Sequence, residues 1–539
     1  MRMPFGFGRL VNVLLIALAC WNAWTFLTAH QAQYAIGEQG RQRLTHAAAK
    51  HVDFISEVVQ SGSKVTWVSG RRSYLVDLSL QRLVNPVVYP TTVDYSGALL
   101  GEANVAVGSR FTDRQMEKMA EAERLRHPLR VGTERGDLVA WDIAPKPRSK
   151  TTAMKEAKHV WRALGLLLLA IPVILLVNGA QWRRNTPIEI FGFCFLAILL
   201  GLLTWVAFST QIVNSAESGV WIMRAKVLAH QGPSGFLEFI TSSTGRYHAP
   251  TYPPLHPVLI AVLALFNGGF HPDLGRLLAI CALAIFGYAL LQILRGNPYR
   301  WGLTLILITL PLLLRCTVWG LAEPLLLALI ALALMQLLAF LDTGEKVAHY
   351  KWLIMIVLAS LVKIEGTLLA LIFLGLYLIR FRTSGIKLST AVAIGTCCFW
   401  PLWVFSQHLE GDFALEAALN RGWSDSLRII LDTSMYLIKL PFNHDEIHQP
   451  SGILLITAIA VNIVLFKQVS EKWLLGGLLI YGAFFLLIFP LSRVLDRADI
   501  VAWHLPALAR VMLPFEIFLI VLPFALTTSK RYLDPSLQL

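Results

Sequence analysis

The chain has few charged residues and few cysteines for its length. Of its 539 residues, 15% are Asp, Glu, Lys or Arg, and only six are cysteine. Every cysteine lies within or at the edge of an apolar segment, and none falls in the polar stretch 30–159. The sequence therefore contains neither a disulfide framework nor a zinc-binding pattern.

Apolar residues are abundant instead. They make up 55% of the chain, and the mean hydropathy is +0.58, which indicates a polytopic membrane protein rather than one soluble core. The net charge of +13 could suggest a nucleic-acid partner. However, most Lys and Arg residues flank apolar segments, where membrane topology and anionic membrane lipids account for them, so we expect no nucleic-acid site.

Three regions are predicted along the chain. Residues 1–29 form an N-terminal transmembrane anchor, and the absence of a clear small-x-small motif favours an uncleaved segment over a signal peptide. Residues 30–159 are polar and predict a small α/β domain outside the membrane, with strands at 65–70 and 85–90, a capping box at 112–115 and a hairpin within 129–143. Residues 160–539 form the transmembrane domain. The fold class is thus mostly α, a polytopic helical protein with an extracytoplasmic α/β domain after the first span.

The positions of Lys and Arg test the topology of the apolar segments. After residue 160, spans are expected at 161–179, 188–209, 274–294, 300–314, 322–341, 388–406, 452–466, 473–489 and 507–526. The basic clusters all fall on the cytoplasmic side under two conditions. Segment 253–269 must lie on the outer surface, and residues 351–380 must form a hairpin of two short helices. The chain then has about twelve spans, with both termini cytoplasmic.

The hairpin explains an unusual pair of charges. Lys363 and Glu365 interrupt an apolar run, and an ionised side chain at the centre of a bilayer is costly. A hairpin places both residues at its external tip. Since two helices this short cannot each cross a membrane, we expect the tip at the floor of a water-filled cavity that opens outward.

Other polar residues are predicted near the same face. The first external loop carries Glu217, Arg224 and Lys226, and residues that follow include Tyr252 and His256. Arg315, Glu323 and Arg510 lie at the external ends of later spans. Each has a structural alternative. Glu323 could cap a helix, Lys363 and Glu365 could form a structural ion pair, the arginines could anchor lipid headgroups, and His256 could be a packing residue.

Together these residue types suit transfer from a lipid-linked phosphate donor. A carboxylate can accept the proton of an acceptor hydroxyl, or hold a divalent cation such as Mg²⁺ or Mn²⁺. Lys and Arg can neutralise the charge that develops on a phosphate leaving group. No cofactor is firmly implied, because the first external loop contains no Asp-Asp or Asp-x-Asp pair.

The order of these motifs resembles a known family. An acid is followed by WIMRAK (221–226), YPPLHP (252–257), GLAEP (320–324), KIEG (363–366) and RVMLP (510–514). This order is similar to the bacterial polyprenyl-phosphate-sugar-dependent glycosyltransferases of the GT-C type, over residues 188–526. The resemblance implies an inverting transferase of the bacterial inner membrane whose active site faces the periplasm. It also implies that Glu217 and Glu323 are the catalytic acids, with the other residues binding substrate. Its partners would be a polyprenyl-phosphate sugar donor, membrane lipids, and a glycan, lipid or protein acceptor.

Two other functions remain open. A transporter or flippase for a lipid-linked sugar would use the same cations without breaking a bond. However, transporters place binding groups near the midplane between repeats, and the sequence contains no internal repeat. A glycan polymerase or ligase with a polyprenyl-diphosphate donor would share the topology and depend more on the arginines.

Overall fold

The structure is a computed structural model. It describes residues 11–26, 64–69, 92–94, 105–109, 126–131, 138–142, 187–209, 220–242, 251–271, 273–381, 384–409, 450–465, 468–469, 471–491 and 505–529. These residues are mostly helical, as the composition predicts. The helices after the sheet are α5 (Pro187–Ser209), α6 (Met223–Thr241), α7 (Leu255–Asn267), α8 (Leu274–Ile293), α9 (Arg300–Ile308), α10 (Pro311–Val318), α11 (Glu323–Thr343), α12 (Lys346–Ser360), α13 (Ile364–Arg380), α14 (Ser384–Ser406), α17 (Pro450–Leu465), α18 (Lys472–Leu491) and α20 (Leu505–Ser529).

A five-stranded sheet lies within the polar stretch that precedes these helices. Its strands are β1 (Lys64–Ser69), β2 (Thr92–Asp94), β3 (Val105–Ser109), β4 (Arg126–Val131) and β5 (Leu138–Asp142), in the order β2-β1-β3-β5-β4. β1 is parallel to both neighbours, whereas β4 and β5 pair antiparallel and overlap the hairpin predicted within 129–143. β1 coincides with the strand predicted at 65–70. The strand predicted at 85–90 and the capping box at 112–115 lie outside the described residues.

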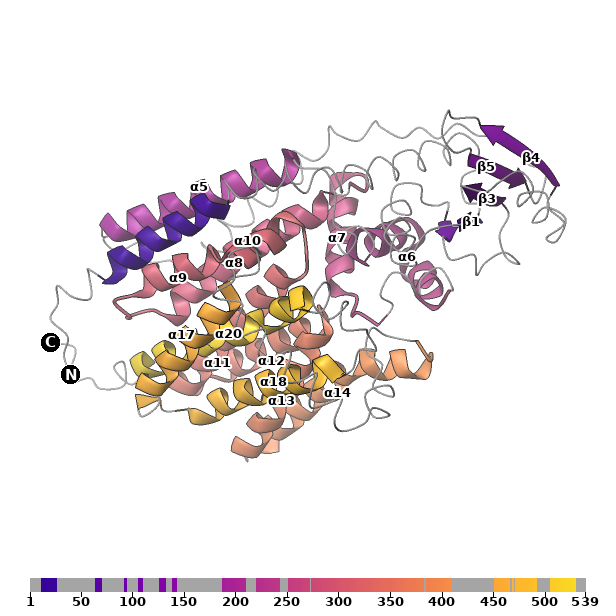
Figure 1. The fold of residues 1–539 in the computed structure, drawn as a ribbon. Coiled ribbons are helices and arrows are strands. Elements are labelled where there is room, and N and C mark those ends of the chain that lie inside the picture. The colour runs from indigo at the N-terminus through magenta and orange to yellow at the C-terminus, as the bar shows by residue number, and fades with distance from the viewer. Residues whose placement is uncertain are drawn as a thin grey trace.

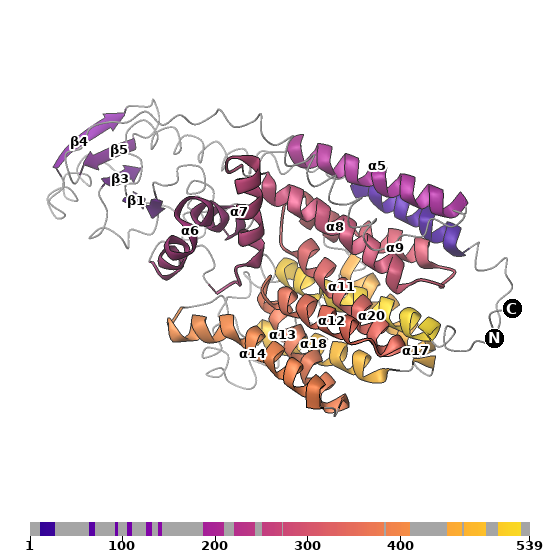
Figure 2. The same cartoon turned by 180° about the vertical axis from the view of Figure 1, so that it is seen from behind.

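The helices form a bundle in which one helix runs crosswise. Most of the bundle helices lie roughly parallel or antiparallel, while α7 crosses their ends, with α6 and the sheet beyond it (Figure 1). The view from behind gives the same arrangement (Figure 2). We call this the α7 end of the bundle and the opposite side the far end. Segment 253–269 thus runs crosswise to the bundle as α7, and its place on the outer surface of the membrane stays a prediction.

Basic residues gather at the far end of the bundle. α12 and α18 begin there, and α8 and α13 finish there, so these helix termini share one side of the molecule. Two ion pairs join helices at this end. Arg300 pairs with Glu189 at the start of α5, and the Arg380 Nε atom lies 3.8 Å from Glu471 Oε2. Exposed basic residues of this end include Arg295, Lys346, Lys351, Arg380 and Lys472.

Five helices in the described part of the chain are long and apolar enough to cross a membrane. They are Ile188–Ala207, Leu274–Ile293, Glu323–Thr343, Ile386–Ser406 and Arg510–Thr527. The span predicted at 300–314 is instead a broken pair, α9 and α10, bent by 54°. The break precedes Pro311, which lacks the backbone N–H needed to continue a helix. Counting this pair gives up to six spans. The count of twelve stays a prediction, and the span at 161–179 lies outside the described residues.

The first helix is packed into the bundle. It covers Val11–Phe26, and its side chains at Ile16, Ala19, Ala23 and Phe26 belong to the main hydrophobic core. The Asn12 side chain is buried, and its Oδ1 atom accepts a hydrogen bond from the backbone N–H of Gly302 at 2.7 Å. A side chain at position 302 would collide with Asn12 and Leu15, so the small glycine permits close packing of the first helix against α9.

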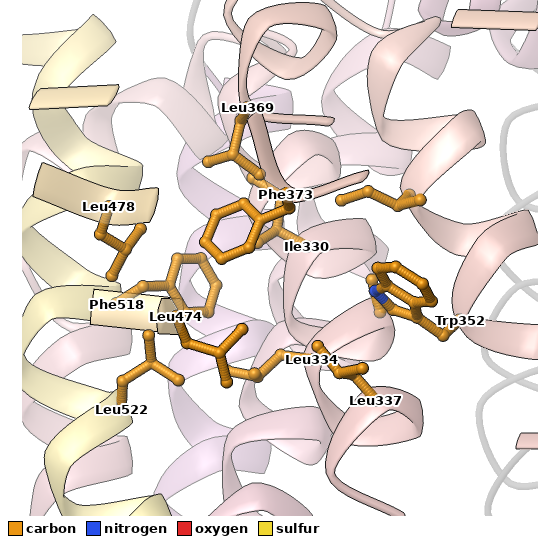
Figure 3. A pocket seen from close by; sticks show the side chains of 12 residues that line it. Ile330, Leu334, Leu337, Trp352, Leu369, Phe373, Leu474, Leu478, Phe518 and Leu522 are labelled. Atoms are coloured by element: carbon orange, nitrogen blue, oxygen red, sulfur yellow. The ribbon is translucent and has the colours of Figure 1, made fainter. Parts of the chain in front are cut away.

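A small cavity lies in the middle of the bundle. Figure 3 shows its lining side chains, which come from α11, α12, α13, α18 and α20 and are all apolar apart from the indole nitrogen of Trp352. Its volume is about 30 Å³. The part of the bundle interior around this cavity is therefore apolar.

Candidate functional site

Four charged side chains lie close together at the α7 end of the bundle, where α11 and α13 begin beside α20. Glu323 is the first residue of α11, Lys363 immediately precedes α13, Glu365 lies in the first turn of α13, and Arg510 lies in α20. The Lys363 Nζ atom is 3.1 Å from Glu323 Oε1 and 3.0 Å from Glu365 Oε1. The Arg510 Nη1 atom is 3.6 Å from the same oxygen of Glu323. We call these four residues the Glu323 cluster.

The break between α12 and α13 brings Lys363 into this cluster. α12 finishes at Ser360, and Lys363 has an extended backbone with φ −149° and ψ 159°. The backbone N–H of Leu255 in α7 donates to the Leu361 carbonyl at 2.9 Å, so the crosswise helix is attached directly to the turn. The two helices approach closely at Gly366, where an added Cβ atom would lie 2.1 Å from the Ala359 carbonyl oxygen. The predicted hairpin at 351–380 is therefore present as two helices.

The cluster is buried and balanced in charge. Lys363 is 5% exposed, and Glu323 and Glu365 are each 3% exposed. The prediction that Lys363 and Glu365 lie at the floor of an open, water-filled cavity is thus wrong for this conformation. The reason is that the two carboxylates neutralise the ammonium group directly, while α7 packs over the turn. Two acids face two cations, so the cluster has no formal net charge. A buried charge needs such pairing to be tolerated.

Glu365 keeps one oxygen outside the ion pair. Its Oε2 atom has no hydrogen-bond partner among the residues that the structure describes. By contrast, Arg510 has a side chain that is 28% exposed, so its guanidinium group is the accessible cation of the cluster. An anion that approached from outside would therefore meet Arg510 before Lys363.

Residues in α6 and α7, and in the segments just before them, form a wall beside the cluster. The fully buried Arg224 donates from Nη2 to the Tyr252 carbonyl at 2.7 Å. The Tyr252 ring centroid lies 6.0 Å from Lys363 Nζ. The Trp221 ring meets both Tyr252, at 5.5 Å between centroids, and His256, at 4.9 Å, in edge-to-face geometry. The guanidinium of Arg224 thus holds the backbone that carries the Tyr252 ring toward Lys363.

Arg315 also belongs to this end of the bundle. Its guanidinium carbon lies 4.2 Å from the ring centroid of Trp319, the residue that follows α10. The neighbouring Cys316 thiol interacts electrostatically with Arg315, Lys363, Glu323 and Arg510, which brings Arg315 close to the Glu323 cluster. A half-buried arginine that stacks on an indole keeps its charge and its planar set of donors.

Of the remaining two predicted site residues, Lys226 is among the described residues and Glu217 is not. Lys226 is half-buried on α6, and a separation of two residues puts it on a different face of the helix from Arg224. Glu217 lies outside the described residues. Eight of the ten predicted site residues are therefore placed by the structure in the cluster, in the wall beside it, or next to it: Glu323, Lys363, Glu365, Arg510, Arg224, Tyr252, His256 and Arg315.

Polar residues of the bundle core that were not predicted from the sequence include one on α18 and one on α20. Tyr481 in α18 donates its hydroxyl to the Val511 carbonyl at 3.2 Å and interacts electrostatically with Glu365. Glu516 in α20 is 2% exposed, and its Oε2 atom has no hydrogen-bond partner in the described part of the chain. The only sequence signal for Glu516 is an acid inside an apolar span, which by itself suggests function.

The described residues contain no group of three or more His, Cys, Asp or Glu side chains placed to hold a metal ion. Within the Glu323 cluster, the ammonium group of Lys363 lies between the two carboxylates where a cation would bind. No family model, curated protein or solved structure matches the chain.

Proposed function

We propose that the chain is an inverting glycosyltransferase of the bacterial inner membrane. It would have the GT-C type of architecture, with about twelve spans, an α/β domain in the periplasm and the Glu323 cluster facing the periplasm. The donor is a polyprenyl-phosphate sugar, and the acceptor is a glycan, lipid or protein. The observation that supports this proposal most is the buried Lys363, held between two carboxylates and next to the partly exposed Arg510, at the end of an apolar bundle.

The proposed reaction uses the two signs of charge for different steps. A hydroxyl of the acceptor attacks the anomeric carbon of the sugar, and the bond between that carbon and the phosphate oxygen breaks. A carboxylate accepts the hydroxyl proton, a role that we assign to Glu217 with Glu323 as the second acid. The polyprenyl phosphate leaves with one additional negative charge, which Arg510 and Lys363 stabilise.

The apolar bundle and the charged cluster also suit the two parts of such a donor. The polyprenyl chain requires contact with lipid or with apolar helices, whereas its phosphate requires cations. When arginine and lysine lie at the end of apolar membrane helices, the binding site for the phosphate is next to the apolar surface for the polyprenyl chain. Arg315, stacked on Trp319 near the same end, adds a third cation that the leaving phosphate could meet.

Substitution of Glu217 tests the proposal. We expect Glu217→Gln to abolish sugar release from polyprenyl-phosphate sugars by the purified full-length protein in lipid nanodiscs, because the amide cannot accept a proton. Protein yield and donor binding should be unchanged. The matched control is Glu238→Gln, which alters an exposed acid on α6 and should retain wild-type release.

The outcomes separate the candidate functions. Wild-type turnover by Glu217→Gln would contradict its role as the base. Donor binding by the wild-type protein without any sugar release would favour the transporter. Use of a polyprenyl-diphosphate donor in preference to the monophosphate would favour the polymerase or ligase.

A further inference from the structure

His256 is a buried polar residue whose two ring nitrogens have no hydrogen-bond partner in the described part of the chain. It is 0% exposed, and neither Nδ1 nor Nε2 has a hydrogen-bond partner among the residues that the structure describes. Buried polar atoms in native proteins are nearly always hydrogen-bonded to protein, water or ligand. Two unpartnered atoms on one ring therefore need an explanation beyond packing, since an apolar side chain of similar size would fill the space at lower cost.

The surroundings of His256 point toward the proposed donor site. The ring lies edge-to-face against Trp221 and interacts electrostatically with Glu323, Arg224 and Lys363. α7, which carries it in its first turn, is bonded through Leu255 to the turn just before Lys363. His256 thus sits on the α7 side of the cluster, whereas Arg510 approaches Glu323 from α20.

Burial also determines which form of the ring is present. It lowers the pKa of His256 to about 3, so the imidazole is neutral at physiological pH. A neutral imidazole offers one N–H donor and one nitrogen acceptor. An anion would bind a positively charged imidazole better than a neutral one. The cations that could bind an anion here are Lys363 and Arg510. The matching partner for one donor and one acceptor is a hydroxyl group, which has both functions.

We propose that His256 determines sugar specificity by hydrogen-bonding to hydroxyl groups of the sugar on the donor. This inference rests on the proposed function, because a sugar linked directly to the phosphate is adjacent to Lys363 and Arg510 when these bind that phosphate. Tyr252 is the half-exposed member of the aromatic group beside the cluster. We therefore expect the sugar to approach the His256 ring from the side on which Tyr252 lies.

The test compares two ligands and two variants in the full-length protein in nanodiscs. The probes are undecaprenyl phosphate and the same lipid phosphate linked to glucose, mannose or arabinose. His256→Leu removes both ring nitrogens with little change in volume, and His256→Asn keeps one donor and one acceptor. Dissociation constants are obtained from ligand-dependent melting temperatures, which do not require turnover.

We expect the wild-type protein to bind at least one sugar-linked probe more tightly than undecaprenyl phosphate. His256→Leu should bind that probe about tenfold more weakly, the effect of losing hydrogen bonds to a ligand, and bind undecaprenyl phosphate as the wild type does. Its melting temperature without ligand should equal or exceed that of the wild type, because two unpartnered polar atoms are removed. His256→Asn should retain part of the sugar preference.

Three results would overturn the inference. One is a sugar preference that His256→Leu leaves unchanged, and another is an equal loss of affinity for both probes. The third is a marked fall in the melting temperature of unliganded His256→Leu, which would assign the residue to packing. In these cases the proposed function stands, provided that the wild type binds lipid phosphate. If the wild type binds no probe, the proposed function itself fails and the inference fails with it.

Discussion

Replacing Lys363 with methionine is expected to lower the free energy of unfolding by about 3–5 kcal/mol, the usual cost of removing one partner from a buried ion pair. The loss is large because one ammonium group serves two carboxylates, Glu323 at 3.1 Å and Glu365 at 3.0 Å. Without it, Glu365 keeps no ionic partner in the described structure, and Glu323 keeps only Arg510 at 3.6 Å. The measurement is the melting temperature of the purified protein.

A second substitution separates lost charge pairing from lost packing. In the double variant Lys363→Met with Glu365→Gln, a neutral amide replaces the carboxylate that is left without an ionic partner, so part of the stability should return. Such non-additivity is the signature of residues that interact directly. The matched control is Lys351→Met, which changes an exposed lysine on α12 and should stay within about 0.5 kcal/mol of the wild type. If Lys363→Met melts like this control, the buried pair is not part of the native protein.

Replacing Gly366 with alanine is expected to destabilise the protein by about 1–3 kcal/mol, the typical cost of overpacking a core. A Cβ atom at this position would lie 2.1 Å from the Ala359 carbonyl oxygen and 2.8 Å from Leu326 Cδ1. The first of these atoms is backbone, so α12 and α13 must separate to make room. This movement would displace Lys363 and Glu365, and we therefore also expect weaker binding of undecaprenyl phosphate.

A second glycine on the same helix provides the control. Gly375 has no atom within 4 Å of the place where its Cβ would lie. Gly375→Ala should therefore stabilise α13 by up to about 1 kcal/mol, because alanine restricts the unfolded chain more than glycine does. The two substitutions are chemically identical and should shift the melting temperature in opposite directions. Shifts of the same sign would show that the close approach of α12 and α13 does not exist.

Charge positions in the sequence predicted the arrangement of the site well. Placing the basic clusters on one side required a break near Lys363 and a surface helix at 253–269. The structure has α12 and α13 on either side of that break and α7 lying crosswise. The break could be predicted because the cost of placing a charge inside a bilayer acts on each segment regardless of its neighbours, while the side of the membrane on which each segment lies stays a prediction. The kink before Pro311 could have been predicted in the same way, since proline interrupts a helix by itself.

The burial of the cluster could not be predicted in this manner. The sequence suggested a pair of charges at a wet tip, yet Lys363 and both acids are nearly inaccessible. Their burial depends on Glu323, which is 40 residues from Lys363 along the chain, and on α7 packing over the turn. Residues so distant in sequence come into contact only through tertiary packing, and a local sequence pattern does not predict such contacts.

By itself, the sequence determined that this is an apolar helical chain with charges concentrated at segment ends, because hydropathy and charge act locally and sum along the chain. Only the tertiary structure decided which charges touch. It placed Lys363 between Glu323 and Glu365, directed Arg224 to a backbone carbonyl, and left both ring nitrogens of His256 without a partner in the described residues. The physical reason is that ion pairs and hydrogen bonds act over about 3 Å, a distance that only the packing of whole helices can set.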